Sequence, residues 1–221
     1  MQGSAAARSV LAAVLAALAG AALWASHAPV GLSVAAWLVA PLVLTALRVA
    51  AGSDPLDPAG EGPSVGRALA VGTLAGVVGY GTMLHWIAYE GGAVAWILLA
   101  GIQALWVGLW SVLVARRLAA RTLPVEAAVL WVGIEWLRTR WPLDGFAWGR
   151  LAYSQVDVEW FVPLGRVLGA SGVSLVVVMV GVAALQVVLG LRTDRTSPPR
   201  AATGQLVGAV LVVALVTVGP P

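Results

Sequence analysis

The sequence predicts an all-α fold, a polytopic membrane helix bundle. Of the 221 residues, 60% are hydrophobic and only 10% are charged, and the mean hydropathy is +0.92, well outside the usage of soluble domains. Long apolar runs recur along the whole chain. Because backbone groups cannot stay unsatisfied in lipid, each long run is read as a helix, which gives about seven transmembrane helices.

The expected spans follow from runs that approach the ~20 apolar residues needed to cross the hydrocarbon. They lie near residues 9–25, 30–50, 65–88, 93–115, 124–140, 164–191 and 202–218. The fifth run is short unless Trp136 to Trp141 extends it. Pro124 suits its first turn, where the missing N–H costs nothing. The first run could instead be a cleaved secretory signal, but the apolar runs that follow favour a retained span.

The arginines predict which way the bundle faces. All thirteen basic residues are Arg; nine fall on the side of the N-terminus, and the other four lie in one loop. The positive-inside rule then places the N-terminus in the cytoplasm, and the C-terminus and the 141–163 loop outside. The sequence has no basic stripe with interleaved aromatic residues, so we expect no nucleic-acid partner.

A few polar residues interrupt the apolar runs. Glu135 lies deep in the fifth run, where a carboxylate normally has a partner or a function. Arg138, three residues later on the same helix face, is expected to form a structural ion pair with it; anchoring a polar headgroup or an adjoining domain is the alternative. Gln103 is expected to make an interhelical hydrogen bond. His27 and His85 are too few for a His-rich metal site, so we expect no metal, although His85 could relay a proton.

Small residues and the absence of Cys add two further constraints. Glycines four residues apart predict close helix packing at Gly72 with Gly76, Gly165 with Gly169, and Gly204 with Gly208. The chain contains no Cys, which excludes disulfides, thiolate metal sites and cysteine nucleophiles.

The outward 141–163 loop between helices five and six is the least lipid-like segment with distinctive content. Its aromatic rings can hold acyl chains while guanidinium groups meet phosphate, so it is expected to lie at the interface. An ordinary aromatic belt remains the reading for Trp24 and Trp96. The candidate lipid or substrate contacts are Trp136, Arg138, Phe146, Trp148, Arg150, Tyr153 and Gln155.

The segment GIEWLRTRWPLDGFAWGRLAYSQ and the helix start that follows it resemble the membrane portion of bacterial apolipoprotein N-acyltransferases. Their pattern combines E-[WF]-L-R, G-F-P-W, G-Y-S-Q and G-x-x-G-x-S. Ala147 stands where the family usually has Pro, and Ala152 where it usually has Gly. The matching residues are Glu135, Trp136, Leu137, Arg138, Gly145, Phe146, Trp148, Tyr153, Ser154, Gln155, Gly169, Gly172 and Ser174.

The resemblance implies transfer of an acyl chain from a phospholipid donor, through a cysteine thioester, to the N-terminal amine of a diacylglyceryl lipoprotein in the bacterial plasma membrane. It implies no cofactor. The family carries the Cys on a nitrilase-like domain that this sequence does not include, so we expect a fragment or a truncated protein, inactive alone, with no catalytic residue of its own. A noncatalytic scaffold for another envelope enzyme and a small transporter are the alternatives.

Overall fold

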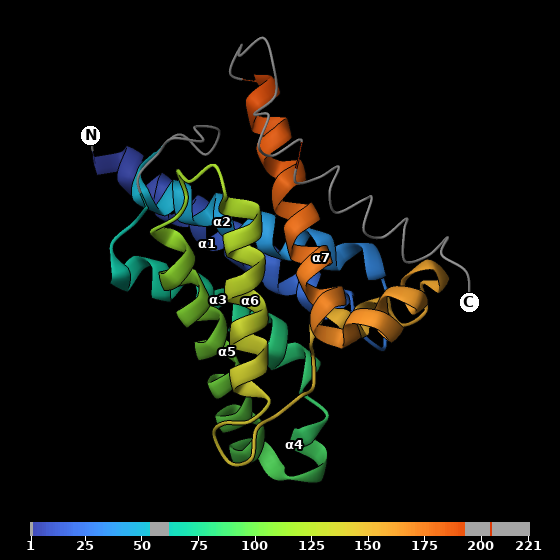
Figure 1. Cartoon of the computed structure of the whole chain (residues 1–221). Helices are drawn as coiled ribbons and strands as arrows, with labels where there is room; N and C mark the ends of the chain where they lie inside the picture. Colours follow the sequence, from blue (N-terminus) through green and yellow to red (C-terminus); the bar gives the residue numbers. More distant parts are fainter. Residues whose placement is uncertain (1, 54–61, 193–203, 205–221) are drawn as a thin grey trace.

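The computed structural model describes residues 2–53, 62–192 and 204, and within these residues every regular element is helical. The predicted all-α fold is therefore confirmed. The long helices are α1 (Gln2–Ala25), α2 (Ala36–Ala51), α3 (Val65–Met83), α5 (Gly92–Ala115), α6 (Leu123–Arg138) and α7 (Val162–Arg192). The short elements are α4 (Ile87–Glu90) and the 3-10 turns η1 (Ser33–Ala35), η2 (Leu151–Gln155) and η3 (Glu159–Phe161) (Figure 1).

Four segments of the described chain are long and apolar enough to cross a membrane. They are Ala5–Ala25, Ser33–Ala51, Gly92–Ala115 and Val162–Gly190. Glycines and Arg67 lower the hydropathy of α3, and α6 has 16 residues, a length of about 24 Å. The fold is a helical membrane bundle. The expected span at 202–218 lies outside the described residues apart from Gly204.

Two helices end earlier than expected. The third helix stops at Met83, because the chain turns before the short α4 begins at Ile87. The helix expected at 124–140 stops at Arg138, so Trp141 belongs to the loop and does not lengthen the span. Both differences shorten a helix at the same end of the bundle and leave irregular backbone there.

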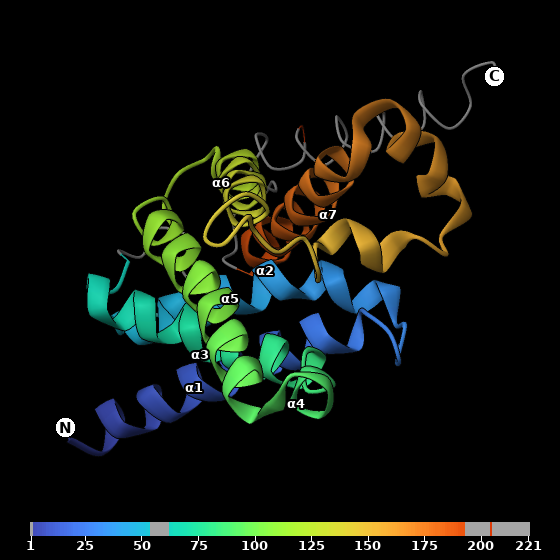
Figure 2. The ribbon, with the colours of Figure 1, turned by 90° about the horizontal axis from the view of Figure 1, so that it is seen from below.

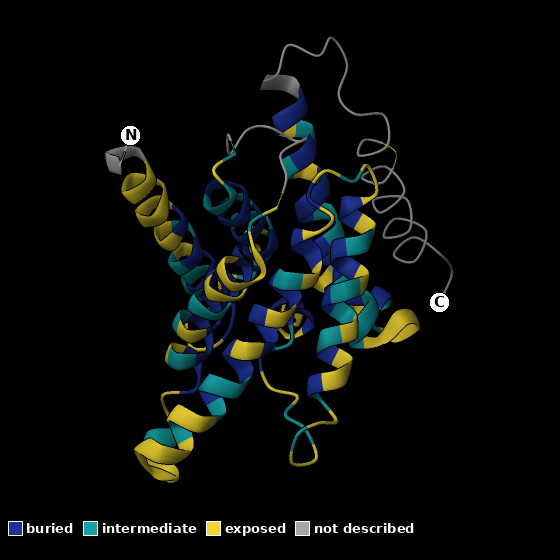
Figure 3. Ribbon diagram, turned by 90° about the vertical axis from the view of Figure 1, so that its left-hand side faces the viewer, coloured by how far each residue is buried: buried dark blue, intermediate teal, exposed yellow. Residues whose placement is uncertain are grey.

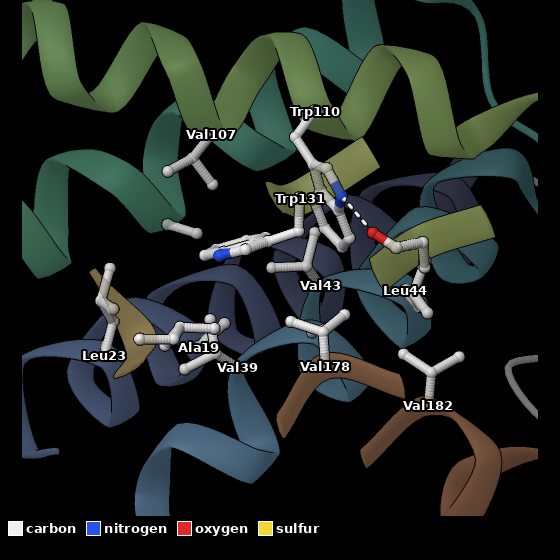
Figure 4. Packing of buried hydrophobic residues seen from close by; sticks show 14 of the residues in the cluster. Ala19, Leu23, Val39, Val43, Leu44, Val107, Trp110, Trp131, Val178 and Val182 are labelled. Atoms are coloured by element: carbon white, nitrogen blue, oxygen red, sulfur yellow. Dashed lines mark hydrogen bonds between the residues drawn. The ribbon is translucent and has the colours of Figure 1, made fainter. Parts of the chain in front are cut away.

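The helices form a layered bundle in which α3 packs between α1 and α5, while α2 contacts α1 and α7. Figure 2 shows α6 and α7 side by side, on the flank away from α1. In the core, the rings of Trp110 and Trp131 meet edge to face with their centroids 5.0 Å apart (Figure 4). The indole N–H of Trp110 donates to the Ala127 carbonyl at 3.1 Å, so this buried polar group is satisfied.

Glycines shape two of these helices differently. A Cβ added at Gly76 would lie 2.5 Å from the Ala104 Cα on α5, so the predicted close packing of this glycine pair is confirmed. Gly169 instead has φ of 63° and kinks α7, and a Cβ on Gly165 would meet only Val173 of its own helix. The second pair therefore bends a helix and does not pack two together, and Gly208 of the third lies outside the described residues.

Exposed residues are mostly apolar along the helix flanks, as expected of a surface that meets lipid. Val10 and Leu18 of α1 and Leu98 of α5 are exposed, and Figure 3 shows the first turns of α1 exposed at the end marked N. The α4 end, which also receives the loop after α6, lies at the opposite end of the bundle (Figure 1).

Candidate functional site

The chain between α6 and α7 turns sharply and then re-enters the bundle. Leu143 and Asp144 have φ of 53° and 63°, and the Phe146 N–H donates to the Arg138 carbonyl at 2.8 Å. Beyond this turn, Leu151 and the other residues of η2, except Tyr153, are buried. Irregular backbone therefore enters an apolar interior, where its polar groups need partners.

Three successive carbonyls of this segment, at residues 148–150, each face a side chain from a different part of the bundle. Arg138 of α6 donates from Nη1 to the first at 2.9 Å, and the Tyr80 hydroxyl of α3 donates to the second at 3.1 Å. His27, just after α1, places Nε2 3.0 Å from the third. The segment is thus tied to α6, to α3 and to the turn that follows α1.

The next two backbone N–H groups also donate to side chains. The Leu151 N–H donates to Glu135 Oε1 at 2.9 Å, and the Ala152 N–H donates to the Ser174 hydroxyl of α7 at 3.0 Å. Together with the three carbonyls, this gives a continuous run of backbone groups satisfied by side chains. We call residues 148–152 the anchored segment.

Glu135 is the centre of this arrangement, and its ionic partner is not the expected one. Its side chain is 2% exposed, and Oε2 lies 3.4 Å from Nε of Arg150. Arg138 does not pair with it; its Nη1 donates to Gln103 Oε1 at 2.9 Å instead. The predicted Glu135–Arg138 pair is therefore wrong. A shared helix face places the two Cβ atoms near each other, but it does not determine which partners the ends of the side chains reach. The long Arg138 side chain reaches α5 and the loop carbonyls, while the loop returns Arg150 to α6.

Gln103 behaves as predicted, since its bond to Arg138 joins α5 to α6. The Arg138 guanidinium also lies 5.4 Å from the centroid of the Tyr80 ring, within the range of a cation–π contact. Arg138 is 2% exposed. It therefore positions the loop from inside the bundle.

Gly149 lets the anchored segment lie directly on α3. Its φ is 71°, and a Cβ there would lie 2.8 Å from Cε1 of Tyr80 and 2.9 Å from Sδ of Met83. Only a residue without a side chain fits this conformation and this contact.

The remaining candidate contacts occupy different surroundings. Gln155 is buried and donates to the Ser33 carbonyl at 2.9 Å, whereas Phe146 is half-buried. Trp136, Trp148 and Tyr153 are exposed. Trp136 stacks under the guanidinium of Arg140, whose Cζ lies 4.2 Å from the ring centroid, and Trp148 reaches a cavity.

This aromatic cavity has a volume of about 990 Å³ and lies at the α4 end. Trp148 meets Trp86 at its wall, with ring centroids 6.0 Å apart. His85 packs edge-on against Trp96 at 5.0 Å and Tyr89 at 5.3 Å. The residues that line the aromatic cavity are Trp24, Ala28, Pro29, Val77, Gly81, Thr82, Met83, His85, Trp86, Tyr89, Trp96 and Trp148.

The aromatic cavity was not foreseen from the sequence, which assigned Trp24 and Trp96 to an interfacial belt. The signal that could have found it is the aromatic cluster HWIAY at residues 85–89, next to a glycine-rich turn. A mostly apolar wall with few polar groups is suited to an acyl chain. In the described parts of the chain, no three His, Asp or Glu side chains gather as a metal site would require.

Comparison with known proteins gives consistent matches. The family model described as "Apolipoprotein N-acyltransferase N-terminal domain" matches residues 19–183. The chain is 33% identical over 180 residues to the apolipoprotein N-acyltransferase of Gloeobacter violaceus and 35% identical over 189 residues to that of Bordetella bronchiseptica. In both cases the match covers 74% of this chain and 32% of the relative. The chain thus spans about a third of the length of these relatives.

Proposed function

Because the chain belongs to the apolipoprotein N-acyltransferase family, through its N-terminal domain, we propose that it is the membrane part that holds the phospholipid acyl donor for transfer to a lipoprotein. The acyl chain occupies the aromatic cavity. The observation that carries this proposal is the aromatic cavity of about 990 Å³ beside Trp148, a residue of the anchored segment.

The rigid backbone next to the aromatic cavity supports a binding role. The side chain of Trp148 is exposed, but its backbone carbonyl accepts a hydrogen bond from Nη1 of Arg138 at 2.9 Å. An indole on a fixed backbone loses less conformational freedom when it packs against an acyl chain, which favours affinity. Trp148, among the seven candidate contacts, is the one in the cavity wall.

The chemical step belongs to polypeptide outside this sequence. Thioester formation requires a thiol, and these 221 residues contain no Cys. The nucleophile is then supplied by a nitrilase-like catalytic domain, and this polypeptide alone is inactive. The lipoprotein acceptor would approach the same end of the bundle.

The α4 end faces outward in this proposal. Support comes from the arginine count, nine on the N-terminal side against four in one loop, and from the indoles at the α4 end, which favour headgroup depth. The 141–163 loop then lies at the outer surface of the bacterial plasma membrane, where the donor and acceptor lipids meet the catalytic domain.

The test uses a phospholipid with a photoreactive diazirine in its acyl chain, added to the purified chain in lipid nanodiscs. Mass spectrometry after irradiation locates the adducts. We expect them on residues that line the aromatic cavity, such as Met83 and Trp86, and we expect Trp148→Ala to lower their yield several-fold.

Trp136→Ala is the matched control, since Trp136 and Trp148 are each 53% exposed but only Trp148 lines the aromatic cavity. Equal loss of adducts in both variants, or adducts spread evenly over the lipid-facing helices, would refute the assignment. An even spread of adducts is the result expected if the chain is a scaffold without a lipid role or a transporter for another substrate.

A further inference from the structure

A second cavity lies at the end of the bundle opposite the anchored segment. It has a volume of about 300 Å³, and its walls come from the first turns of α1, the last turn of α2 and the first turns of α3. α1 and α3 begin at this end, and α2 ends there. Trp24, near the end of α1, and Met83, the last residue of α3, line the aromatic cavity, so the two cavities lie at opposite ends. We call this one the arginine cavity.

Positive charge distinguishes the arginine cavity. Arg8 of α1 and Arg67 of α3 both line it, and among the described residues of its lining there is no carboxylate. Arg67 donates from Nη1 to the Ala50 carbonyl at 3.3 Å, which holds its guanidinium over the end of α2. Both side chains are exposed, so they are accessible to an anion.

Apart from Ser9, the other side chains of the wall are apolar. Ala12, Val71 and Leu74 line the cavity on the side toward the middle of the bundle. A ligand that fits would therefore combine an anionic group with an apolar part directed along the helices. An anionic phospholipid has both features, whereas inorganic phosphate has the anionic group but no apolar part.

The depth of the arginines in the bundle agrees with a headgroup position. Arg8 lies seventeen residues before Ala25 on α1, a rise of about 25 Å, and Ala25 lies near the wall of the aromatic cavity. The hydrocarbon core is about 30 Å thick. With the aromatic cavity at one interface, Arg8 and Arg67 come to the opposite one.

We propose that the arginine cavity binds one anionic phospholipid of the leaflet opposite the aromatic cavity, with its phosphate between Arg8 and Arg67. Guanidinium groups match the oxygens of a phosphodiester through paired, charge-assisted hydrogen bonds. This lipid is separate from the acyl donor and does not depend on the role proposed above for the aromatic cavity. It would hold α1 against α2 and α3.

The experiment measures lipid binding to the full chain in detergent by native mass spectrometry. Phosphatidylglycerol is titrated against the wild type and against the double variant Arg8→Gln, Arg67→Gln. Each arginine near a lipid phosphate contributes about 1 kcal/mol, equivalent to about fivefold in affinity. We expect one saturable phosphatidylglycerol in the wild type, and binding about 25-fold weaker in the double variant.

The control is Arg116→Gln, Arg121→Gln, which removes the same charge from exposed positions at the same end that do not line the arginine cavity. It should change the affinity by less than about twofold. An equal loss in this control would overturn the proposal in favour of a diffuse charge effect. Complete competition by glycerol 3-phosphate would overturn it in favour of a site for a free phosphate.

The wild type tests the proposal without any substitution. Phosphatidylcholine should bind the arginine cavity at least about tenfold more weakly than phosphatidylglycerol, because its headgroup carries a compensating positive charge. Equal binding of the two lipids would refute the proposal even if the double variant failed to fold.

Discussion

Replacing Glu135 tests whether this carboxylate anchors the loop. Glu135→Ala removes the acceptor of two N–H groups, from the Leu151 backbone at 2.9 Å and from the Trp131 indole at 3.0 Å. It also removes the partner of Arg150. Glu135→Gln retains an oxygen at the same place and loses only the charge, so the two variants separate the role of the acceptor from that of the charge.

The structure gives the size of each effect. Leu151 is fully buried, and a buried donor left without an acceptor costs about 1–3 kcal/mol; the same range applies to the indole of Trp131. The side chain of Arg150 is only 15% exposed, so loss of its ionic partner adds a further cost, which its remaining bond to Ser171 limits to about 1–2 kcal/mol. These costs are not additive between neighbours. We expect about 3–5 kcal/mol for Glu135→Ala and about 1–2 kcal/mol for Glu135→Gln.

Unfolding by sodium dodecyl sulfate in mixed micelles, followed by tryptophan fluorescence, gives the free energy of unfolding. Limited trypsin digestion reports on the loop: cleavage after the exposed Arg140 is the internal reference, and cleavage after Arg150 reports release of the anchored segment. Glu135→Ala should speed the second cleavage relative to the first. Equal stability of the two variants, or unchanged cleavage after Arg150, would show that Glu135 does not hold the segment.

Two further substitutions test close backbone packing. Gly149→Ala should destabilise the fold by about 2–4 kcal/mol, because it combines a left-handed backbone with a clash against Tyr80; Gly133→Ala on α6, where an added Cβ meets nothing within 4 Å, should be neutral or slightly stabilising in the same unfolding titration. Gly76→Ala should cost about 1–3 kcal/mol by separating α3 from α5, whereas Gly101→Ala, also free of neighbours within 4 Å, should not; equal effects within either pair would contradict the packing explanation.

The candidate site was only partly predictable from the sequence. The cost of a carboxylate in an apolar helix showed that Glu135 needs a partner, and the structure supplies one. The identity of that partner depends on how the loop returns, which is a non-local contact fifteen residues away. Spacing along α6 favours Arg138, and no local rule brings Arg150 back to the same helix.

The aromatic cavity could not be derived from sequence order for the same reason. Trp24, Trp86 and Trp148 are far apart in the chain, and each alone resembles an interfacial anchor. They line the same cavity because α1 and α3 end, and the loop after α6 passes, at the same end of the bundle. Likewise, glycine spacing is the same at residues 72–76 and 165–169, yet the first pair packs two helices and the second contains the kink of α7.

Composition and local motifs were enough to assign the helical membrane class and the family, because both depend on residues close together in the chain. Apolar runs must form helices in lipid wherever they pack, and the motifs that carry the family resemblance all lie within one stretch of the chain, from Glu135 to Ser174. The folded structure was needed to show which side chains satisfy the backbone of residues 148–152 and where the two cavities lie. Those features depend on contacts between distant segments, which are set by the packing of the whole bundle.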